Sequence, residues 1–279
     1  MGDETGVALD AASGRVRLKW HRLRRSAQEP PFAIANLRVG LALGASMEVD
    51  IRRLADDDWV CLHDDVLDRE TDGAGPVSAV DAAAIRRLRI AGADFAPPLL
   101  SELAAALAAA PTATGSLQLD LKEPAETLSE RAVANFAEIV GPVARQCLLT
   151  GYDWSAVQRL GAGVGGLRLG YDPLEAAEGR RLDTAERFSA FVDEVLATAP
   201  TAAAFYLYHR FATAALARGV DPVRRLQANG AMIDIWTLDP TTSEIDTILP
   251  AMVAAGADQI TTNDPIGLAA LWRRLEASP

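Results

Sequence analysis

Two short stretches carry the residues on which the fold and the chemistry depend: MEVDI at residues 47–51 and WVCLHD at residues 59–64. Side chains two positions apart on a strand share a face, so Glu48 and Asp50 point to one side and the apolar residues next to them point to the other. This alternation predicts a buried strand that carries an acidic pair. Because unpaired charge is costly to bury, the pair predicts a bound cation, and oxygen ligands suit Ca²⁺ or Mg²⁺. His63 is a candidate acid or base close by.

The composition is that of an ordinary globular protein. The chain has 279 residues, of which 49% are hydrophobic and 23% charged, enough for one α/β barrel or for two smaller domains. Its net charge of -11 argues against a nucleic-acid partner, which needs a surplus of Lys and Arg. An anionic substrate therefore requires a metal ion and local cations to reverse the sign of the field at the site.

The N-terminal sequence contains no apolar region typical of a secretory signal, and no apolar run is long enough to span a bilayer. We therefore expect a cytoplasmic protein without stable membrane insertion; the oligomeric state is left open. Residues 1–15 are expected to be mobile, and residues 16–279 to form one domain. Cys61 and Cys147 lie in apolar runs and are expected to be small buried hydrophobes.

Strand and helix patterns alternate along the rest of the chain. Helical patterns separate the strand candidates, among them one at residues 80–90, and a short extended run at residues 59–62 precedes His63. This order, without a linker, predicts the α/β class and a single (β/α)8 TIM barrel, with a doubly wound open sheet as the competitor. The strand candidates are residues 16–20, 47–51, 116–122, 147–152, 167–171, 203–208, 232–238 and 259–262.

Polar residues follow or end several of these strands. In a barrel the carboxyl ends of the strands share one rim, where catalytic groups gather. The residues at these ends are His21 and Arg22, Glu48 and Asp50, Asp120 and Lys122, Trp236 and Asp239, and Asn263 and Asp264.

In order and spacing, these residues resemble the glycerophosphodiester phosphodiesterase family, and the resemblance extends from about Leu18 to Leu271. That family has His-Arg-Gly after its first strand, then a Glu-x-Asp strand and a His-Asp pair. The counterparts here are His-Arg-Leu at 21–23, Glu-Val-Asp at 48–50 and His-Asp at 63–64. Further matches are the loop at 67–77, PLLSEL at 98–103, LDLK at 119–122, WTLD at 236–239, GAD at 256–258 and ITTNDP at 260–265.

The chain departs from the family pattern in three places. Leu23 stands where the family has Gly, a residue that usually permits positive φ or close backbone approach. Asp120 replaces the usual Glu and is one methylene shorter. The Pro-Glu-Asn-Thr that begins the family's first helix appears only as QEPP at residues 28–31.

The resemblance implies a phosphoric diester hydrolase that converts a glycerophosphodiester to glycerol 3-phosphate and an alcohol through a cyclic phosphate. It implies that His21 and His63 form the acid–base pair and that Arg22 and Lys122 bind the phosphate. The implied ligands of a divalent metal, Ca²⁺ or Mg²⁺, are Glu48, Asp50 and Asp120.

Other interpretations remain open. The substrate could be a larger lipid head group, as for a lysophospholipase D or a sphingomyelinase D, or the barrel could be non-catalytic and only bind phosphate or metal. The acidic pair alone is also typical of an exposed face or a structural ion pair. Trp236 is either a wall for the alcohol group, and so substrate-binding, or a core residue. For His209 we favour a packing or substrate-edge role over catalysis.

Overall fold

The computed structural model of the protein describes residues 5–12 and 14–277. The chain divides into two compact units. We call residues 22–24 and 28–169 the acidic-strand unit, and residues 1–21, 25–27 and 170–279 the C-terminal unit.

The acidic-strand unit is built on parallel strands β3 (Ser46–Arg53), β5 (Ser116–Leu121) and β6 (Cys147–Gly151), with the start of β7 (Arg168–Tyr171) beside β6. The register pairs Asp50 with Asp120. Short β4 (Trp59–Val60) folds back antiparallel on the end of β3, so the run before His63 forms a hairpin arm.

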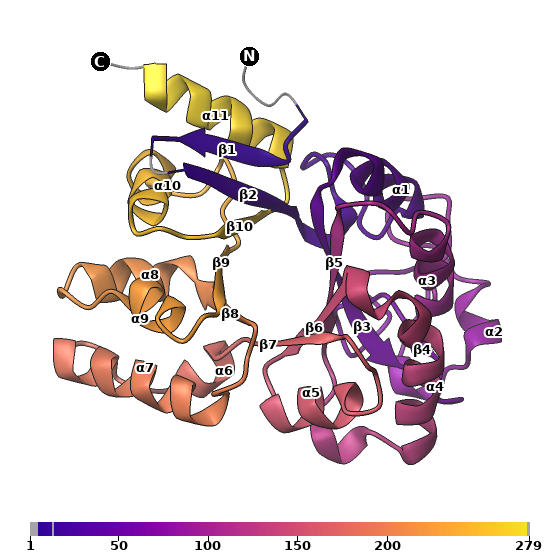
Figure 1. The fold of residues 1–279 in the computed structure, drawn as a ribbon. Coiled ribbons are helices and arrows are strands. Elements are labelled where there is room, and N and C mark those ends of the chain that lie inside the picture. The colour runs from indigo at the N-terminus through magenta and orange to yellow at the C-terminus, as the bar shows by residue number, and fades with distance from the viewer. Residues whose placement is uncertain (1–4, 13, 278–279) are drawn as a thin grey trace. The chain divides into compact units, whose positions relative to one another are not determined.

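The helices of this unit cover its sheet with their buried side chains. All but the short helix at Ala82–Ile85 pack one beside the next in chain order, and their buried side chains include Leu37, Leu103, Phe136 and Val157 (Figure 1). Side-chain caps fix two of the helix starts: Ser129 accepts the N–H of Ala132, and Asp153 accepts that of Ala156. The helices are α1 (Ile34–Leu43), α2 (Ala82–Ile85), α3 (Leu100–Ala108), α4 (Glu130–Val140) and α5 (Trp154–Gly161).

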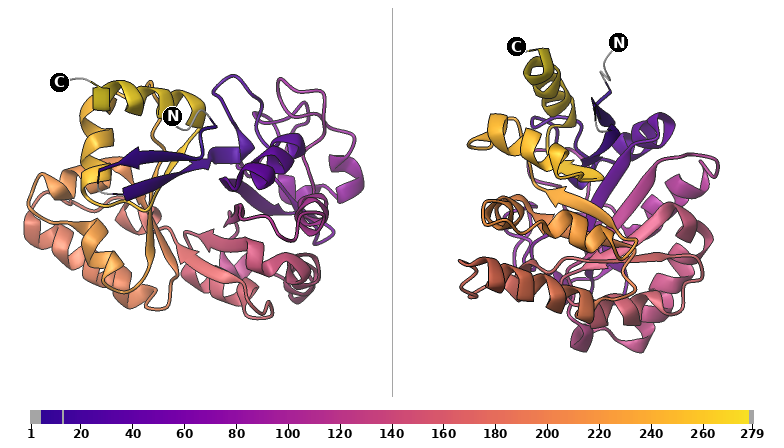
Figure 2. Two further views of the ribbon diagram at one scale, coloured as in Figure 1. Left: turned by 45° about the horizontal axis from the view of Figure 1, so that its top comes forward. Right: turned by 60° about the vertical axis from the view of Figure 1, so that its left-hand side comes forward.

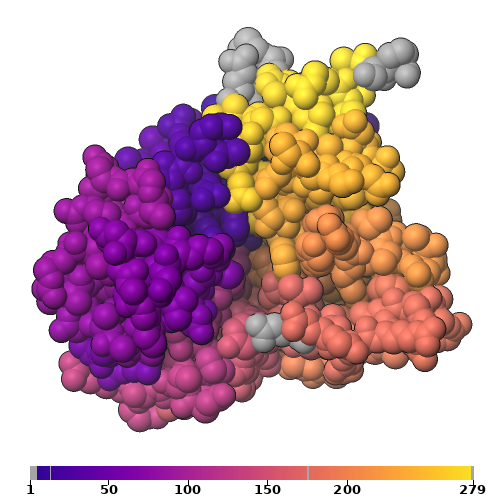
Figure 3. Space-filling model, turned by 180° about the vertical axis from the view of Figure 1, so that it is seen from behind, coloured from indigo at the N-terminus to yellow at the C-terminus, as the bar shows by residue number. Residues whose placement is uncertain are grey.

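The C-terminal unit has its own run of parallel strands. The end of β7 pairs with β8 (Ala204–Tyr208), which pairs with β9 (Met232–Trp236), then β10 (Gln259–Thr262), then β2 (Gly14–Trp20). The outer faces of its helices contribute to the salmon-to-yellow surface in Figure 3. They are α6 (Leu174–Ala177), α7 (Ala185–Thr198), α8 (His209–Leu216), α9 (Pro222–Gln227), α10 (Ile245–Ala254) and α11 (Pro265–Ala277).

A buried ion pair ties three strands of the C-terminal unit together. Lys19 Nζ of β2 lies 3.1 Å from Asp234 Oδ2 of β9, with side chains 3% and 0% exposed. Asp234 also accepts hydrogen bonds from Gln259 and Thr261 of β10. Lys19 stands over the ring of Tyr206. The buried carboxylate is therefore fully partnered, as such a group must be to be tolerated.

The N-terminal region contains a strand that the sequence analysis did not predict. β1 (Ala8–Ala11) pairs antiparallel with β2, and α11 packs along both strands (Figure 2). The Trp272 indole N–H donates to the carbonyl of Asp10 at 2.8 Å. The mobile segment expected at residues 1–15 thus includes this strand, and residues 1–4 and 13 lie outside the described residues.

The predicted elements recur with small shifts in their ends, and one helix was predicted too long. The pattern at residues 80–90 gives only α2, because the chain after Arg86 pairs with the loop at 70–72. The amide of Asp72 bonds to the carbonyl of Arg89, and that of Ala91 to the carbonyl of Glu70. Both cysteines are buried free thiols, as expected. No helix within residues 5–12 and 14–277 is long and apolar enough to cross a membrane.

Candidate active site

Three carboxylates meet in the acidic-strand unit, and they are the three predicted metal ligands. Glu48 and Asp50 share a face of β3, and Asp120 lies opposite Asp50 on β5. One oxygen from each lies within 4.8 Å of the others. Glu48 is 3% exposed and Asp50 1%. The two-residue period of the strand and the register of the sheet together assemble this acidic trio.

Two cationic side chains flank the acidic trio. Arg22 Nε lies 3.0 Å from Asp50 Oδ2, and Lys122 Nζ lies 3.1 Å from Asp50 Oδ1. Lys122 is also 2.5 Å from Asp120 Oδ2. Burial works against its charge, but the carboxylates of Asp120 and Asp50 outweigh burial and raise the pKa of Lys122 above its usual value. Lys122 is therefore an ammonium ion across the physiological range.

Asp120 is oriented by its neighbour on β6. The Thr150 hydroxyl donates to Asp120 Oδ1 at 2.8 Å, and the Gln118 amide donates to Thr150 Oγ1 at 2.8 Å. These bonds fix the carboxylate so that Oδ2 faces Lys122. Supporting hydrogen bonds of this kind hold metal-binding carboxylates in position.

The Arg22–Leu23 segment has an unusual backbone. Arg22 has φ 53° and Leu23 has φ 60°, both in the left-handed region. The Arg22 amide donates to Glu48 Oε2 at 2.8 Å, and the Asn36 side chain donates to the Leu23 carbonyl at 3.0 Å. Leu23 therefore keeps the conformation that a glycine would adopt freely, and its side chain is fully buried.

His63 is held through its backbone and its ring. Its amide donates to Glu70 Oε2 at 2.8 Å, and its carbonyl accepts from Arg52 Nε at 2.7 Å. The ring nitrogen Nδ1 lies 2.9 Å from Asp64 Oδ1. The hydrogen bond from Arg69 lowers the pKa of Asp64 to about 2. An ionised carboxylate can only accept, so Nδ1 carries the hydrogen and Nε2 is left for proton transfer.

His21 belongs to the C-terminal unit, at the end of β2. Its Nδ1 lies 2.8 Å from Asn263 Oδ1. The Asn263 side-chain amide donates to Asp239 Oδ2 at 2.8 Å, and the Thr262 hydroxyl donates to Asp239 Oδ1 at 2.9 Å. Asp239 thus turns the oxygen of Asn263 toward His21, and His21 donates from Nδ1.

Trp236, the remaining predicted site residue, also lies in the C-terminal unit. It is half-buried at the end of β9 and stacks on Tyr208 with ring centroids 4.9 Å apart. His209 is buried and packs edge-on against Tyr208. Burial lowers the pKa of His209, which favours the neutral form. This packing agrees with a structural role for His209.

Several supporting residues gave no signal in the sequence. Glu70 and Arg52 bind the backbone of His63, and Thr150 orients Asp120. Glu70 lies in a turn-rich loop without periodicity, and Thr150 reads as an ordinary strand residue. Their roles depend on which segments meet in space.

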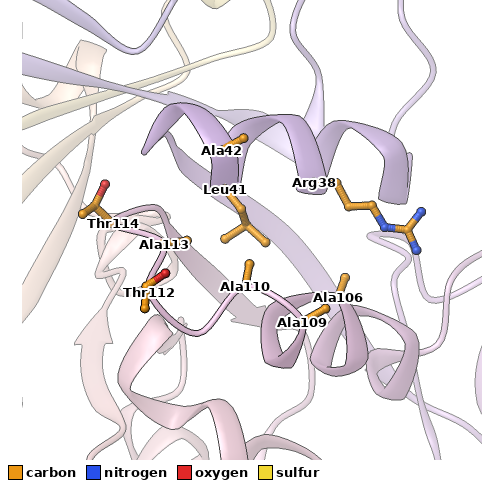
Figure 4. A pocket seen from close by; sticks show the side chains of 9 residues that line it. All are labelled: Arg38, Leu41, Ala42, Ala106, Ala109, Ala110, Thr112, Ala113 and Thr114. Carbon is orange, nitrogen blue, oxygen red and sulfur yellow. The ribbon is translucent and has the colours of Figure 1, made fainter.

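A cavity of about 550 Å³ lies elsewhere in the acidic-strand unit, beside the C-terminal ends of α1 and α3 (Figure 4). Its lining is mostly alanine, with Arg38 and Thr114 toward opposite ends. It contains neither a carboxylate nor a histidine, so it does not have the chemistry of the acidic trio.

The glycerophosphoryl diester phosphodiesterase family model matches residues 33–141. This region belongs to that family. The match contains the acidic trio, His63 and Lys122, while His21, Arg22 and Trp236 lie outside it. Members of the family are phosphoric diester hydrolases that act on glycerophosphodiesters, so the predicted family and enzyme class are confirmed. None of the curated proteins matches the sequence.

Solved structures share the fold over nearly the whole chain. A phosphodiesterase from Oleispira antarctica, in complex with the product sn-glycerol-3-phosphate, has a TM-score of 0.67 at 19% identity and covers 94% of this chain and 96% of its own. The glycerophosphodiester phosphodiesterase of Thermotoga maritima has a TM-score of 0.66 at 18% identity, with 92% and 98% covered. That of Parabacteroides distasonis has a TM-score of 0.66 at 15% identity, with 93% and 96% covered. The predicted α/β fold, a single (β/α)8 TIM barrel, is confirmed.

Proposed function

We propose that the protein hydrolyses glycerophosphodiesters to glycerol 3-phosphate and an alcohol in a metal-dependent reaction that uses two histidines. The observation that carries this proposal is the acidic trio, with Glu48 and Asp50 buried, flanked by Arg22 and Lys122. The bound sn-glycerol-3-phosphate in the Oleispira antarctica structure supports the substrate class.

The acidic trio fits a hard divalent ion. Metal–oxygen distances of about 2.0–2.6 Å allow ligand oxygens to lie up to about 5 Å apart across the ion. One carboxylate oxygen from each of Glu48, Asp50 and Asp120 lies within 4.8 Å of the other two, which is within that range. Three carboxylate oxygens so close together are the hard ligands that such an ion prefers.

When bound, the ion neutralises phosphate charge and acts as a Lewis acid toward the phosphoryl group. Arg22 and Lys122 supply charged donors for the phosphoryl oxygens, Arg22 as a planar fork and Lys122 as a point charge. Glu48 accepts the backbone amide of Arg22 and so fixes the position of the backbone that carries the guanidinium side chain.

His21 and His63 are assigned the proton transfers. One histidine removes the proton from the neighbouring hydroxyl of the substrate as its oxygen attacks phosphorus; the other protonates the departing alcohol, giving a cyclic phosphate. In the second step the roles reverse, and water opens the ring to glycerol 3-phosphate. Hydrogen bonds to Asp64 and Asn263 set the tautomers of the two rings for these transfers.

The test is release of glycerol 3-phosphate from glycerophosphocholine and glycerophosphoethanolamine, with Ca²⁺, Mg²⁺ or EDTA. We expect turnover that requires metal and falls by at least about 100-fold in His63→Ala, since general acid–base catalysis contributes about that much or more. Glu48→Ala and Asp50→Asn should lose metal-dependent turnover.

Asp183 provides a matched control for Asp50. It also lies between two cations, with Arg181 Nε at 2.5 Å and Arg187 at 2.7 Å, but on the surface of the C-terminal unit. Asp183→Asn should keep full activity.

Turnover that persists in EDTA would count against the metal role. If only lysophospholipids or sphingomyelin were hydrolysed, the substrate would be a lipid head group and not a glycerophosphodiester. A folded protein that hydrolyses no diester would favour a non-catalytic barrel that only binds phosphate or metal.

A further inference from the structure

We propose that Glu70 is a positioning residue that couples the guanidinium of Arg22 to the backbone of His63. This inference rests on the proposed function, because it assigns Glu70 the task of keeping a phosphate-binding group and an acid–base group in a fixed relation. All the contacts that carry it lie within the acidic-strand unit.

The two oxygens of Glu70 have different partners. Oε2 accepts the backbone amides of His63 and Asp64, each at 2.8 Å. Oε1 accepts a hydrogen bond from Arg22 Nη1 at 3.3 Å. The side chains of Glu70 and Arg22 are only 7% and 16% exposed. A shielded carboxylate thus bridges a charged donor and the residue proposed for proton transfer.

If Glu70 served only to hold the His63 loop, it would not need a negative charge. Holding two backbone amides takes one acceptor oxygen, and a neutral glutamine supplies it. The loop also has its own bonds, since the Thr71 hydroxyl donates to the Leu67 carbonyl and the Gly75 amide to Asp68. The negative charge on the second oxygen matters because it faces Arg22 in a shielded place, where charge-assisted bonds are strong and lone charges costly.

Arg22 is fixed at three points as a result. Its amide donates to Glu48, its Nε forms an ion pair with Asp50, and its Nη1 donates to Glu70. Loss of the Glu70 contact frees the end of the fork that is directed toward the His63 loop. Misplacement of a catalytic group by about 1 Å can cost about 100-fold in rate.

The first experiment measures kcat and KM for glycerophosphocholine in wild type, Glu70→Gln, Arg22→Gln and the double variant. Glu70→Gln keeps an oxygen for both amides and places an amide group toward Arg22. We expect near-native thermal unfolding but a kcat lower by about 10- to 100-fold. In the double variant the loss should be no larger than in Arg22→Gln alone, because the two residues act as one unit.

Asp221 provides a matched control. Its Oδ1 accepts the Arg224 amide at 3.0 Å, and its Oδ2 lies 3.3 Å from Arg224 Nε, so it makes the same two kinds of contact at the start of α9. Asp221→Asn should leave kcat and KM unchanged. Glu70→Ala, which also loses the amide bonds, should lower both kcat and the unfolding temperature.

A second readout does not need turnover. The backbone amide resonances of His63 and Asp64 should shift in Arg22→Gln as well as in Glu70→Gln, since Glu70 transmits the loss of the guanidinium. Unmoved resonances in Arg22→Gln, native kcat in Glu70→Gln, or multiplicative losses in the double variant would each overturn the inference. Absence of turnover in wild type with these shifts present would instead count against the proposed function alone.

Discussion

Leu23 shows how tertiary contacts can hold one residue in an unfavourable conformation. Its φ of 60° is in the left-handed region, which costs an L-residue with a side chain about 1–2 kcal/mol. The conformation persists because the Leu23 carbonyl is held by Asn36 and the preceding residue is anchored to Glu48. Burial of the leucine side chain offsets the cost.

Substitutions at Leu23 should therefore follow an unusual order. Both Leu23→Ala and Leu23→Gly lose buried apolar surface, but glycine also removes the backbone strain. We expect Leu23→Gly to be more stable than Leu23→Ala by about 1 kcal/mol in urea unfolding, although both are less stable than wild type.

Leu37 is the control for this order, because it is fully buried within helix α1. There the glycine variant should be less stable than the alanine variant by about 1 kcal/mol, since glycine is a poor helix former. The same order at both positions would show that the left-handed backbone of Leu23 carries no strain.

At the scale of elements, the acidic trio depends on how closely β5 approaches the end of α1. Gly115 precedes β5, and a Cβ at this position would lie 2.9 Å from the Ala45 carbonyl oxygen and 3.3 Å from Leu41 Cα. Both are backbone atoms, one in the α1–β3 connection and the other in α1 itself, so they cannot move aside as a flexible side chain would.

We expect Gly115→Ala to lower the free energy of unfolding by about 1–3 kcal/mol through overpacking. Gly165 is the control, because no atom beyond its chain neighbours lies within 4 Å of its added Cβ and its φ is outside the left-handed region. Gly165→Ala should be neutral or stabilising by up to about 1 kcal/mol. Denaturant unfolding of both variants measures this difference. Equal stabilities would contradict the close approach of the chain before β5 to the end of α1.

At the scale of the whole molecule, a protein with net charge -11 brings three carboxylates together in the acidic trio. Metal binding to the native state should therefore stabilise the fold by mass action. At about 100 times Kd the gain is about 2.7 kcal/mol.

Thermal unfolding with increasing Ca²⁺ or Mg²⁺ measures this stabilisation. We expect the unfolding temperature of wild type and Asp183→Asn to rise, and that of Asp50→Asn to stay unchanged over the same range. An equal rise in Asp50→Asn would place the binding ion outside the acidic trio.

Local pattern was sufficient for most of the elements. Two-residue alternation placed Glu48 and Asp50 on one face, and the 3.6-residue period placed most of the helices that follow the strands. Prediction from local pattern failed at residues 86–90, where the expected helix is replaced by pairing with the loop at 70–72. It also failed at β1, which forms against β2 and α11.

The sequence by itself determined the order of strands and helices, the family and the residue types of the candidate site, because these follow from short-range periodicity and from motifs with fixed spacing. Only the tertiary structure decided that Asp120 stands opposite Asp50, that Glu70 connects Arg22 to the His63 backbone, and that Leu23 accepts a left-handed backbone. These features depend on sheet register and on contacts between segments distant along the chain. Such contacts form only when burial of the core brings those segments together.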